Sequence, residues 1–287
     1  YEMTSSLVGS EMCIRDSGYT HQVLVRLKQT DHGILRNGIW AYTNERLCKD
    51  DLITVQIVEN ECSDNIAPVN LPLDIAYEDD DIIVINKPFD MPAHPSAGNH
   101  DNTLANALMY YYGSQNKPFV YRCINRLDRD TTGLTIVAKH ALAGGILGNA
   151  VAKRAIHRTY YAVCSGCTPA CMRISAPIAR KDASTIERCV DFKRGENAVT
   201  DFIRIKYNPD NNLSLVKLRL LTGRTHQIRV HMKYIGFPLI GDFLYNPDYT
   251  YISRQALHSG RLVFTHPVTG QKMNLISDIP SDMKSLF

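Results

Sequence analysis

The chain has 287 residues, of which 44% are hydrophobic and 21% are charged, so it is long enough for one large domain with a small appended one. It contains no apolar run of about 18 residues, which excludes a membrane-spanning helix. The formal net charge of +3 is only mildly basic, so the total charge neither requires nor excludes a nucleic-acid partner.

The N-terminal part of the chain divides into a tail and a small module. Residues 1–17 show no periodicity and resemble translated sequencing-adapter DNA, with a disordered tail as the alternative, so they are set aside. Within residues 18–60, the segment His21–Lys28 begins a strand or a helix, and Leu52–Val58 has the composition of a strand. The stretch GILRNGIWAYTNERLCKDDLITV resembles a small RNA-binding module first seen in a ribosomal small-subunit protein; a generic β-rich cap is the alternative.

A large domain is expected over residues 74–287, after a polar linker at 61–73. The predicted helices are Thr103–Gly113 and Ala141–Ala155, and the predicted strands are Asp81–Lys87, His157–Cys164, Asp201–Tyr207 and Leu213–Leu221. Strands outnumber helices and do not alternate strictly with them, which argues against a doubly wound parallel sheet. We therefore expect the α+β class, with a large, mainly antiparallel mixed sheet and flanking helices.

The eight cysteines are scattered and no secretory signal is visible, so we expect reduced thiols and a cytoplasmic protein. The spacing Cys164-x-x-Cys167-x-x-x-Cys171 could ligate zinc or iron, but a fourth ligand at matching spacing is missing and Cys189 is distant. Unligated thiols beside a hairpin are the preferred interpretation, so no metal site is assigned.

One carboxylate stands out in the middle of the chain. Asp128 lies in the segment Arg126–Leu134, among arginines, threonines and a glycine, between the apolar stretches Phe119–Tyr121 and Leu134–Val137. We expect these two stretches to be short strands that hold the carboxylate between them. A neighbouring guanidinium favours the charged form of a carboxylate inside a pocket, so Asp128 is a candidate reactive group; a structural ion pair is the alternative.

Two further segments could line a pocket around this carboxylate. The stretch Asn86–Pro95 carries three prolines and His94, so it predicts a stiff loop that forms either a pocket wall or a rigid surface turn. In the strand His157–Val163, alternation places Tyr160 and Ala162 on one face. A tyrosine there could stack on a nucleobase or exchange a proton, with burial in the core as the alternative.

The segment Leu221–Met232 combines a turn with an amphipathic helix, for which Thr225 is the expected N-cap. The apolar face has residues spaced at i, i+4 and i+7, namely Ile228, Met232 and Ile235. The other face is cationic and carries His226, Arg229 and Lys233. Together with the positive end of the helix, this face suits a phosphate or a carboxylate such as Asp128; a solvated basic surface is the alternative.

The signatures of zinc proteases, P-loops, dinucleotide-binding folds and serine hydrolases do not occur in the sequence. Four segments instead resemble, in order, the motifs of the RluA-like family of pseudouridine synthases: EDDDIIVINKPFDMPAHPS, NRLDRDTTGL, HRTYYAV and LLTGRTHQIRVHM. The likeness runs from about Ile75 to Pro280. The sequence departs from the family at Asn125, often His, at Thr132, usually Ser, and at Arg158, where Lys is expected. All three departures keep polarity or charge, so we expect activity to survive.

The resemblance implies a role for each matching residue. Asp128 would be the catalytic carboxylate, and Arg229 would pair with it and hold it ionised. Tyr160 would stack against the target base and help to move a proton, while Arg126 would enter the RNA in place of the flipped uridine. The remaining residues expected to bind substrate are His94, Arg224, Thr225, His226 and Gln227.

The reaction that the resemblance implies is the isomerisation of uridine to pseudouridine in structured RNA. Substrate and product are isomers, so no cofactor is expected. Large-subunit ribosomal RNA is the expected substrate and transfer RNA the alternative, and the protein is expected to act as a monomer in the cytoplasm. Whether Asp128 attacks the sugar, attacks the base or abstracts a sugar proton stays open at this stage.

Two other classes of protein compete with this interpretation. A non-catalytic RNA-binding protein with the same fold predicts the loss of the carboxylate, yet Asp128 is present. A glycoside hydrolase usually needs two carboxylates, and here only Asp130 lies nearby. We expect Asp130 to form a cap or to face solvent.

Overall fold

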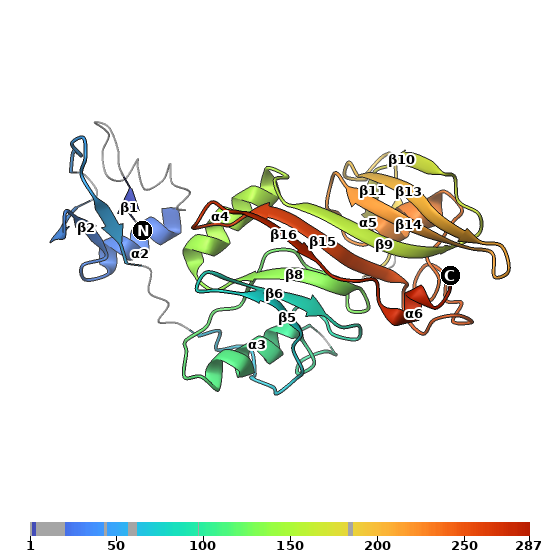
Figure 1. Cartoon of the computed structure of the whole chain (residues 1–287), viewed down its shortest axis with the longest axis horizontal. Helices are drawn as coiled ribbons and strands as arrows, with labels where there is room; N and C mark the ends of the chain where they lie inside the picture. Colours follow the sequence, from blue (N-terminus) through green and yellow to red (C-terminus); the bar gives the residue numbers. More distant parts are fainter. Residues whose placement is uncertain (1, 4–20, 43–44, 57–61, 97, 183–185) are drawn as a thin grey trace.

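The computed structural model describes residues 2–3, 21–42, 45–56, 62–96, 98–182 and 186–287 (Figure 1). Two residues of the expected tail, Glu2–Met3, form strand β1, whereas the rest of that tail and the last two residues of the predicted strand Leu52–Val58 lie outside the described residues. Within the described part of the chain, no helix combines the length and the apolar composition needed to cross a membrane.

The small N-terminal module pairs one helix with a four-stranded antiparallel sheet in the order β1-β4-β2-β3. Its further elements are α2 (His21–Gln29), β2 (Ile34–Arg36), β3 (Ile39–Trp40) and β4 (Ile53–Val55). The segment left open between strand and helix is a helix, because Val23, Leu24 and Leu27 then share one face and enter the core. Leu142, from the large domain, completes that core and attaches the module.

The described part of the predicted linker, residues 62–73, has no helix or strand, but it is held firmly against the large domain. The backbone N–H of Val69 donates to the carbonyl of Asn106 at 3.1 Å, and the Asn106 amide donates back to Ala67 at 2.7 Å. Leu71 and Leu73 pack against the same part of the core. These residues therefore form a fixed strap, with hydrogen bonds that a free linker would leave to water.

The large domain is built on one mixed sheet in the order β10-β13-β14-β9-β15-β8-β6-β5, with β16 beside β15 and β7 beside β8. Its strands are β5 (Ile75–Glu78), β6 (Ile82–Lys87), β7 (Arg122–Cys123), β8 (Thr132–Ala138), β9 (His157–Ser165), β10 (Cys171–Ser175), β13 (Val199–Asn208), β14 (Leu213–Leu220), β15 (Leu257–Thr265) and β16 (Lys272–Ile276). Every pairing is antiparallel except β15 with β8. A separate hairpin joins β11 (Ile178–Arg180) to β12 (Arg188–Val190). The predicted α+β class with a mainly antiparallel sheet is confirmed.

Helices cover both faces of the sheet, which explains its apolar strands. Strand β6 alternates so that Ile83 packs under α3 (Leu104–Gly113), whereas Ile82 packs under α4 (Ala141–Ala152). Helix α3 begins at the predicted residue, Thr103, whose hydroxyl accepts a hydrogen bond from the N–H of Asn106 in a capping box. Helix α5 (Gln227–Tyr234) packs on the other half of the sheet, and the short helix α6 (Ser281–Lys284) lies near the C-terminus (Figure 1).

Two predicted boundaries are wrong for physical reasons. Phe119–Tyr121 is not a strand, because its backbone bonds to Ser63 instead of to a neighbouring strand: the Phe119 carbonyl accepts from the N–H of Ser63 at 3.2 Å, and the N–H of Tyr121 donates to the Ser63 hydroxyl at 3.1 Å. Strand pairing starts only at Arg122, in β7. Helix α4 ends at Ala152 instead of residue 155, because the chain turns at Arg154 through a left-handed backbone angle of φ 60°.

Gly133 lies very close to the backbone of the neighbouring strand and gives a test of the fold. It has φ +107°, and a Cβ there would lie 2.3 Å from the carbonyl oxygen of Ser259 on β15. We expect Gly133→Ala to lower the free energy of unfolding by at least about 2 kcal/mol, measured by urea denaturation, because backbone rather than a side chain must move. Gly270 has φ +72° with open space around it, so Gly270→Ala should cost only about 1 kcal/mol. Equal losses in the two variants would contradict this account of the β8–β15 contact.

Candidate active site

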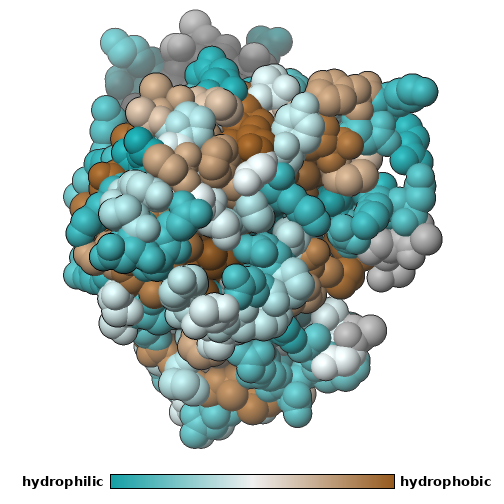
Figure 2. All heavy atoms as spheres, turned by 90° about the vertical axis from the view of Figure 1, so that its right-hand side faces the viewer, coloured by the Kyte–Doolittle hydropathy of each residue, from teal (hydrophilic) through white to brown (hydrophobic). Residues whose placement is uncertain are grey.

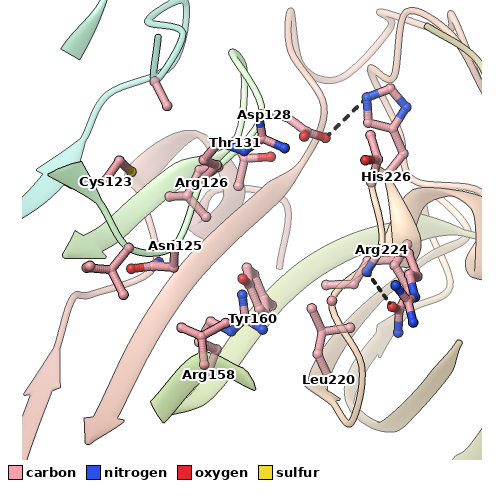
Figure 3. A pocket seen from close by; sticks show the side chains of 18 of the residues that line it. Cys123, Asn125, Arg126, Asp128, Thr131, Arg158, Tyr160, Leu220, Arg224 and His226 are labelled. Atoms are coloured by element: carbon pink, nitrogen blue, oxygen red, sulfur yellow. Dashed lines mark hydrogen bonds and ion pairs between the residues drawn. The ribbon is translucent and has the colours of Figure 1, made fainter. Parts of the chain in front are cut away.

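The four motif segments meet in one cleft of about 980 Å³ (Figure 3). The proline-rich loop supplies one wall, the segment around Asp128 a second, Tyr160 of β9 the floor, and the turn before α5 the third wall. Among the described residues that line it, Asp128 is the single carboxylate, and it stands among seven arginines. Such a cleft favours a polyanionic substrate that meets one reactive acid.

Asp128 lies in the loop between β7 and β8, which buried polar contacts hold in place. The side-chain oxygen of Asn125 accepts from the N–H of Ile136 at 2.8 Å, and the Thr135 hydroxyl donates to the carbonyl of Asn125 at 2.6 Å. Leu127, the residue directly before Asp128, is buried in the core. The Asp128 carboxylate itself is 30% exposed and faces the cleft. The fixed loop therefore presents one reactive side chain to the cleft.

A buried lysine, for which no role was predicted, supports this loop from below. The ammonium group of Lys87 donates to the carbonyl of Arg129 at 2.9 Å and to that of Pro88 at 2.7 Å. Burial lowers the pKa of Lys87 to about 7, although the charges of Asp130 and Asp128 oppose the shift. The available signal was a lysine that ends an otherwise apolar strand, since a buried amine needs acceptors.

Arg229 joins the cleft to a second, buried carboxylate. Its side chain is 1% exposed; Nε and Nη2 donate to Asp242 at 2.7 and 2.8 Å, and Nη1 donates to Asp128 at 2.8 Å. Burial alone would lower the pKa of Arg229, but Asp242 and Asp128 outweigh it and raise the pKa above its ordinary value. The predicted cationic face thus meets carboxylates, not solvent, at this position.

The second carboxylate, Asp242, was missed by the sequence interpretation. It is fully buried, and it also accepts hydrogen bonds from the backbone N–H groups of Leu244 and Tyr245 at 3.0 and 3.2 Å. The signal that could have found it is a lone acid in the apolar stretch GFPLIGDFLY, because buried acids require partners.

The start of α5 differs from the prediction. The N-cap is His226, in a left-handed conformation with φ 55°, and not Thr225, which is exposed. The Gln227 side chain fixes the turn before the helix, since its oxygen accepts from the N–H of Arg224 at 2.9 Å and from the Thr222 hydroxyl at 2.8 Å. Its amide nitrogen donates to the carbonyl of Val199 and to the hydroxyl of Thr200, each at 3.0 Å. Because all four hydrogen-bonding positions of Gln227 are used, it positions the turn, and its contact with substrate stays a prediction.

His226 is the second nitrogen-bearing side chain beside Asp128, after Arg229. Its Nε2 lies 3.8 Å from the Asp128 carboxylate, and its Nδ1 lies 3.0 Å from the Tyr245 hydroxyl (Figure 3). That hydroxyl accepts from the N–H of Arg188 at 2.9 Å, and its proton has no other acceptor in the described part of the chain, so it is donated to Nδ1. Burial lowers the pKa of His226, although Asp128 opposes this, so the ring is neutral near pH 7 with Nε2–H toward the cleft.

The other predicted site residues differ in how far they reach into the cleft. The Tyr160 ring is buried in the core, but its hydroxyl borders the cleft without a hydrogen bond to any described residue. Arg126 is exposed and makes no ion pair within the described residues. His94 is exposed on the opposite wall, where burial and the charge of Arg126 lower its pKa. Arg224 and Thr225 are exposed on the turn before α5.

The exposure of Asp130 differs from its prediction, and two sets of residues have the composition of a metal site. Asp130 does not face solvent; its side chain is 13% exposed and pairs with the Arg129 guanidinium at 3.2 Å. The sulfur atoms of Cys164, Cys167 and Cys171 do not come together as a ligand group among the described residues. The described residues do gather two carboxylates around one imidazole, in the set Asp79, Asp81 and His266. There, backbone N–H groups donate to Nδ1 of His266, so Nε2 carries the proton that faces Asp79 at 2.9 Å.

The arrangement defines a class of enzyme. A cationic cleft with one ionised carboxylate, an open tyrosine hydroxyl and a buried arginine suits chemistry at the glycosidic bond of a nucleic acid, where positive character develops on the sugar. A hydrolase with two facing carboxylates does not fit, since Asp128 is the one acid lining the described cleft.

Comparison with known proteins identifies the family. Residues 81–234 match the family described as RNA pseudouridylate synthase. The chain is 38% identical to the uncharacterized RNA pseudouridine synthase YjbO of Bacillus subtilis, over 94% of this chain and 95% of that protein. It is 41% identical to ribosomal large subunit pseudouridine synthase D of Haemophilus influenzae, over 80% of this chain and 75% of that protein. The solved structure of human RNA pseudouridylate synthase domain containing 1 superposes with a TM-score of 0.61 at 26% identity, over 72% of this chain and 83% of that one.

The chain therefore belongs to the RNA pseudouridylate synthase family, and it is an isomerase that converts uridine to pseudouridine in RNA. The predicted family and reaction are confirmed.

Loss of Asp242 tests the buried ion pair. We expect Asp242→Asn to lower the free energy of unfolding by about 3 kcal/mol, because Arg229 stays buried with less opposite charge. Pseudouridine formation should fall by about a hundredfold, because Arg229 no longer fixes Asp128. Arg254 makes a similar two-pronged contact with Asp282, whose atoms do not line the cleft, so Asp282→Asn should lose stability and keep activity. Full activity in Asp242→Asn would contradict the positioning role.

The pH dependence of activity tests the protonation state of His226. Because its pKa is lowered from 6.5, the ring stays neutral at pH 7, and activity should fall only as the pH drops below 6.5. A protonated ring beside Asp128 would compete for its charge and repel Arg229. His226→Gln removes this titration, so its acid limb, measured as the rate of product formation, should move to lower pH. Identical acid limbs in both proteins would rule out the involvement of His226.

Proposed function

We propose that this protein isomerises uridine in large-subunit ribosomal RNA, with Asp128 as the catalytic carboxylate. The observation that carries the proposal is the position of Asp128 as the one acid lining the described cleft, fixed by Arg229 at 2.8 Å. The substrate is supported by relatives named ribosomal large subunit pseudouridine synthase D in several bacteria, at 38–41% identity. Transfer RNA is the alternative substrate, and the experiment below separates the two.

The proposed reaction starts when the target nucleotide leaves its stack and enters the cleft. The bond between N1 of the base and C1′ of the sugar breaks, the base rotates, and a new bond forms between C5 and C1′. C5 loses its proton and N1 gains one, so atoms and electrons balance without a cofactor. Attack on the sugar, attack on the base and abstraction of a sugar proton would all use the ionised carboxylate of Asp128.

Each neighbouring side chain has a proposed part in this step. Tyr160 stacks against the uracil, and its free hydroxyl is available to move a proton. Arg126 fills the space that the uridine leaves in the RNA, which its exposure and lack of an ion pair with the described residues support. His94, Arg224, Thr225 and His226 contact the RNA from the cleft walls. The burial of the Tyr160 ring at the floor of the cleft supports protection of the detached base from water.

The rest of the proposal concerns where and how the protein acts. The small N-terminal module, residues 18–60, is proposed to bind RNA beside the catalytic domain, residues 74–287; the basic last turn of α2 supports this. A cytoplasmic location fits the ribosomal substrate. The protein is proposed to act as a monomer.

The decisive test is Asp128→Asn. We expect this variant to fold and bind RNA but to form product at least about a thousandfold more slowly, because an amide can neither attack nor stabilise the charged sugar. Purified protein would be incubated with unmodified transcripts of large-subunit ribosomal RNA and, separately, with transfer RNA, followed by pseudouridine mapping.

The matched control is Asp130→Asn, which removes a nearby carboxylate that pairs with Arg129 instead of Arg229. It should keep activity within about tenfold of the unchanged protein. Normal activity in Asp128→Asn would overturn the role of this carboxylate. Product found in transfer RNA alone would overturn the ribosomal substrate but leave the chemistry intact.

A further inference from the structure

A second hollow, of about 490 Å³, adjoins the active-site cleft. The two share the turn Gly223–Thr225, which forms a wall of both. Four arginines and one acid line the second hollow: Arg180, Arg188, Arg194, Arg224 and Glu196. We call these five residues the arginine hollow. Its lining has a formal charge of +3, because four positive side chains face one negative side chain.

Two of the arginines lie directly opposite each other, and neither forms an ion pair with an acid of the described residues. Arg180 on β11 is the antiparallel partner of Arg188 on β12. Like charges in this position destabilise a hairpin unless an anion lies between them. Arg180 is exposed and makes no ion pair with a described residue, and the Arg188 guanidinium donates only to the neutral carbonyls of Ile186 and Glu187. The hairpin thus keeps two positive charges available to an anion.

The other two arginines are fixed by acids and so shape the hollow. Arg194 donates to Asp182 at 2.7 and 3.0 Å and to Asp191 at 2.8 Å. Arg224 pairs with Glu196 and donates to the carbonyl of Asn197 at 3.2 Å. Because these two side chains are already held, they lose little further conformational entropy when a ligand binds.

The arginine hollow is also tied to the catalytic centre. The N–H of Arg188 donates to the Tyr245 hydroxyl at 2.9 Å, and the same hydroxyl contacts His226 at 3.0 Å. The Tyr245 ring lies 5.0 Å from the Arg229 guanidinium. An anion in the hollow is therefore held at a fixed position relative to Asp128. Figure 2, which faces the end of the molecule with β10 and β13, shows mainly hydrophilic residues around smaller apolar patches.

We propose that the arginine hollow binds a backbone phosphate of the RNA strand next to the target uridine. The inference rests on the proposed function, because the shared turn brings any strand with a base in the cleft past the hollow. Arginine forks match phosphate oxygens in geometry and charge, whereas no aromatic ring lines the described hollow to stack on a base. This contact would fix the register of the strand without reading its sequence.

The test compares the double variant Arg180→Gln/Arg188→Gln with the same changes to lysine. All binding is measured in the Asp128→Asn background with an RNA fragment that contains the mapped uridine, across a salt series. We expect the glutamine variant to bind about tenfold more weakly, and its slope of log K against log salt to be shallower by about 1 for each lost phosphate contact. The lysine variant should recover most of the slope. With Asp128 intact, kcat at saturating RNA should stay unchanged.

A matched control removes an arginine outside the arginine hollow. Arg173 on β10 is exposed and pairs with Asp201, so Arg173→Gln should leave the salt slope unchanged. An unchanged slope and affinity in the glutamine variant would overturn the proposal, and so would a loss of kcat without a change in slope. Replacing the phosphates that flank the uridine with neutral linkages should weaken RNA binding to the unchanged protein. The glutamine variant should bind the neutral and the ordinary RNA with equal affinity. Because the binding arm needs no turnover, failure of the arginine hollow and failure of the proposed function give different results.

Discussion

The three-way contact of Arg229 with two carboxylates is the constraint on which the site depends. A buried guanidinium is stable only when its donors and its charge are both satisfied, and Asp242 meets most of that need with two short hydrogen bonds. One donor, Nη1, is left for Asp128, whose carboxylate is partly exposed. The result is an acid that is held in place yet still faces the cleft. The catalytic loop, α5 and the segment after it are fixed relative to one another by this contact.

The surrounding polar groups also hold the segments that carry the site residues. Lys87 holds the backbone of the Asp128 loop, and Gln227 holds the turn before α5. Tyr245 connects His226 with the hairpin that carries Arg188. The side chains that face the cleft therefore depend on these polar contacts for their positions. This pattern is expected of a site that must place a detached base within fractions of an ångström.

Much of the fold was predictable because it follows local periodicity. The buried strand Ile82–Lys87 and the helix that begins after Thr103 were both expected from pattern and capping. The meeting of Asp128 with Arg229, 101 residues apart, came from the family resemblance and not from spacing. Asp242 and Lys87 were missed because a buried charge is recognised only through its tertiary partners. The prediction that Thr225 is the N-cap was wrong, because His226 takes that position in a left-handed turn that the Gln227 side chain holds.

The position of Asp242 also bears on where the working unit ends along the chain. The stretch that matches the family stops at residue 234, before Asp242 and before β15. Yet β15 is the central strand between β8 and β9, and Asp242 neutralises the arginine at the heart of the site. A fragment cut at the limit of the family match would lose both the middle of its sheet and the counter-charge of Arg229. The end of the family match and the end of a foldable enzyme are therefore different places in this protein.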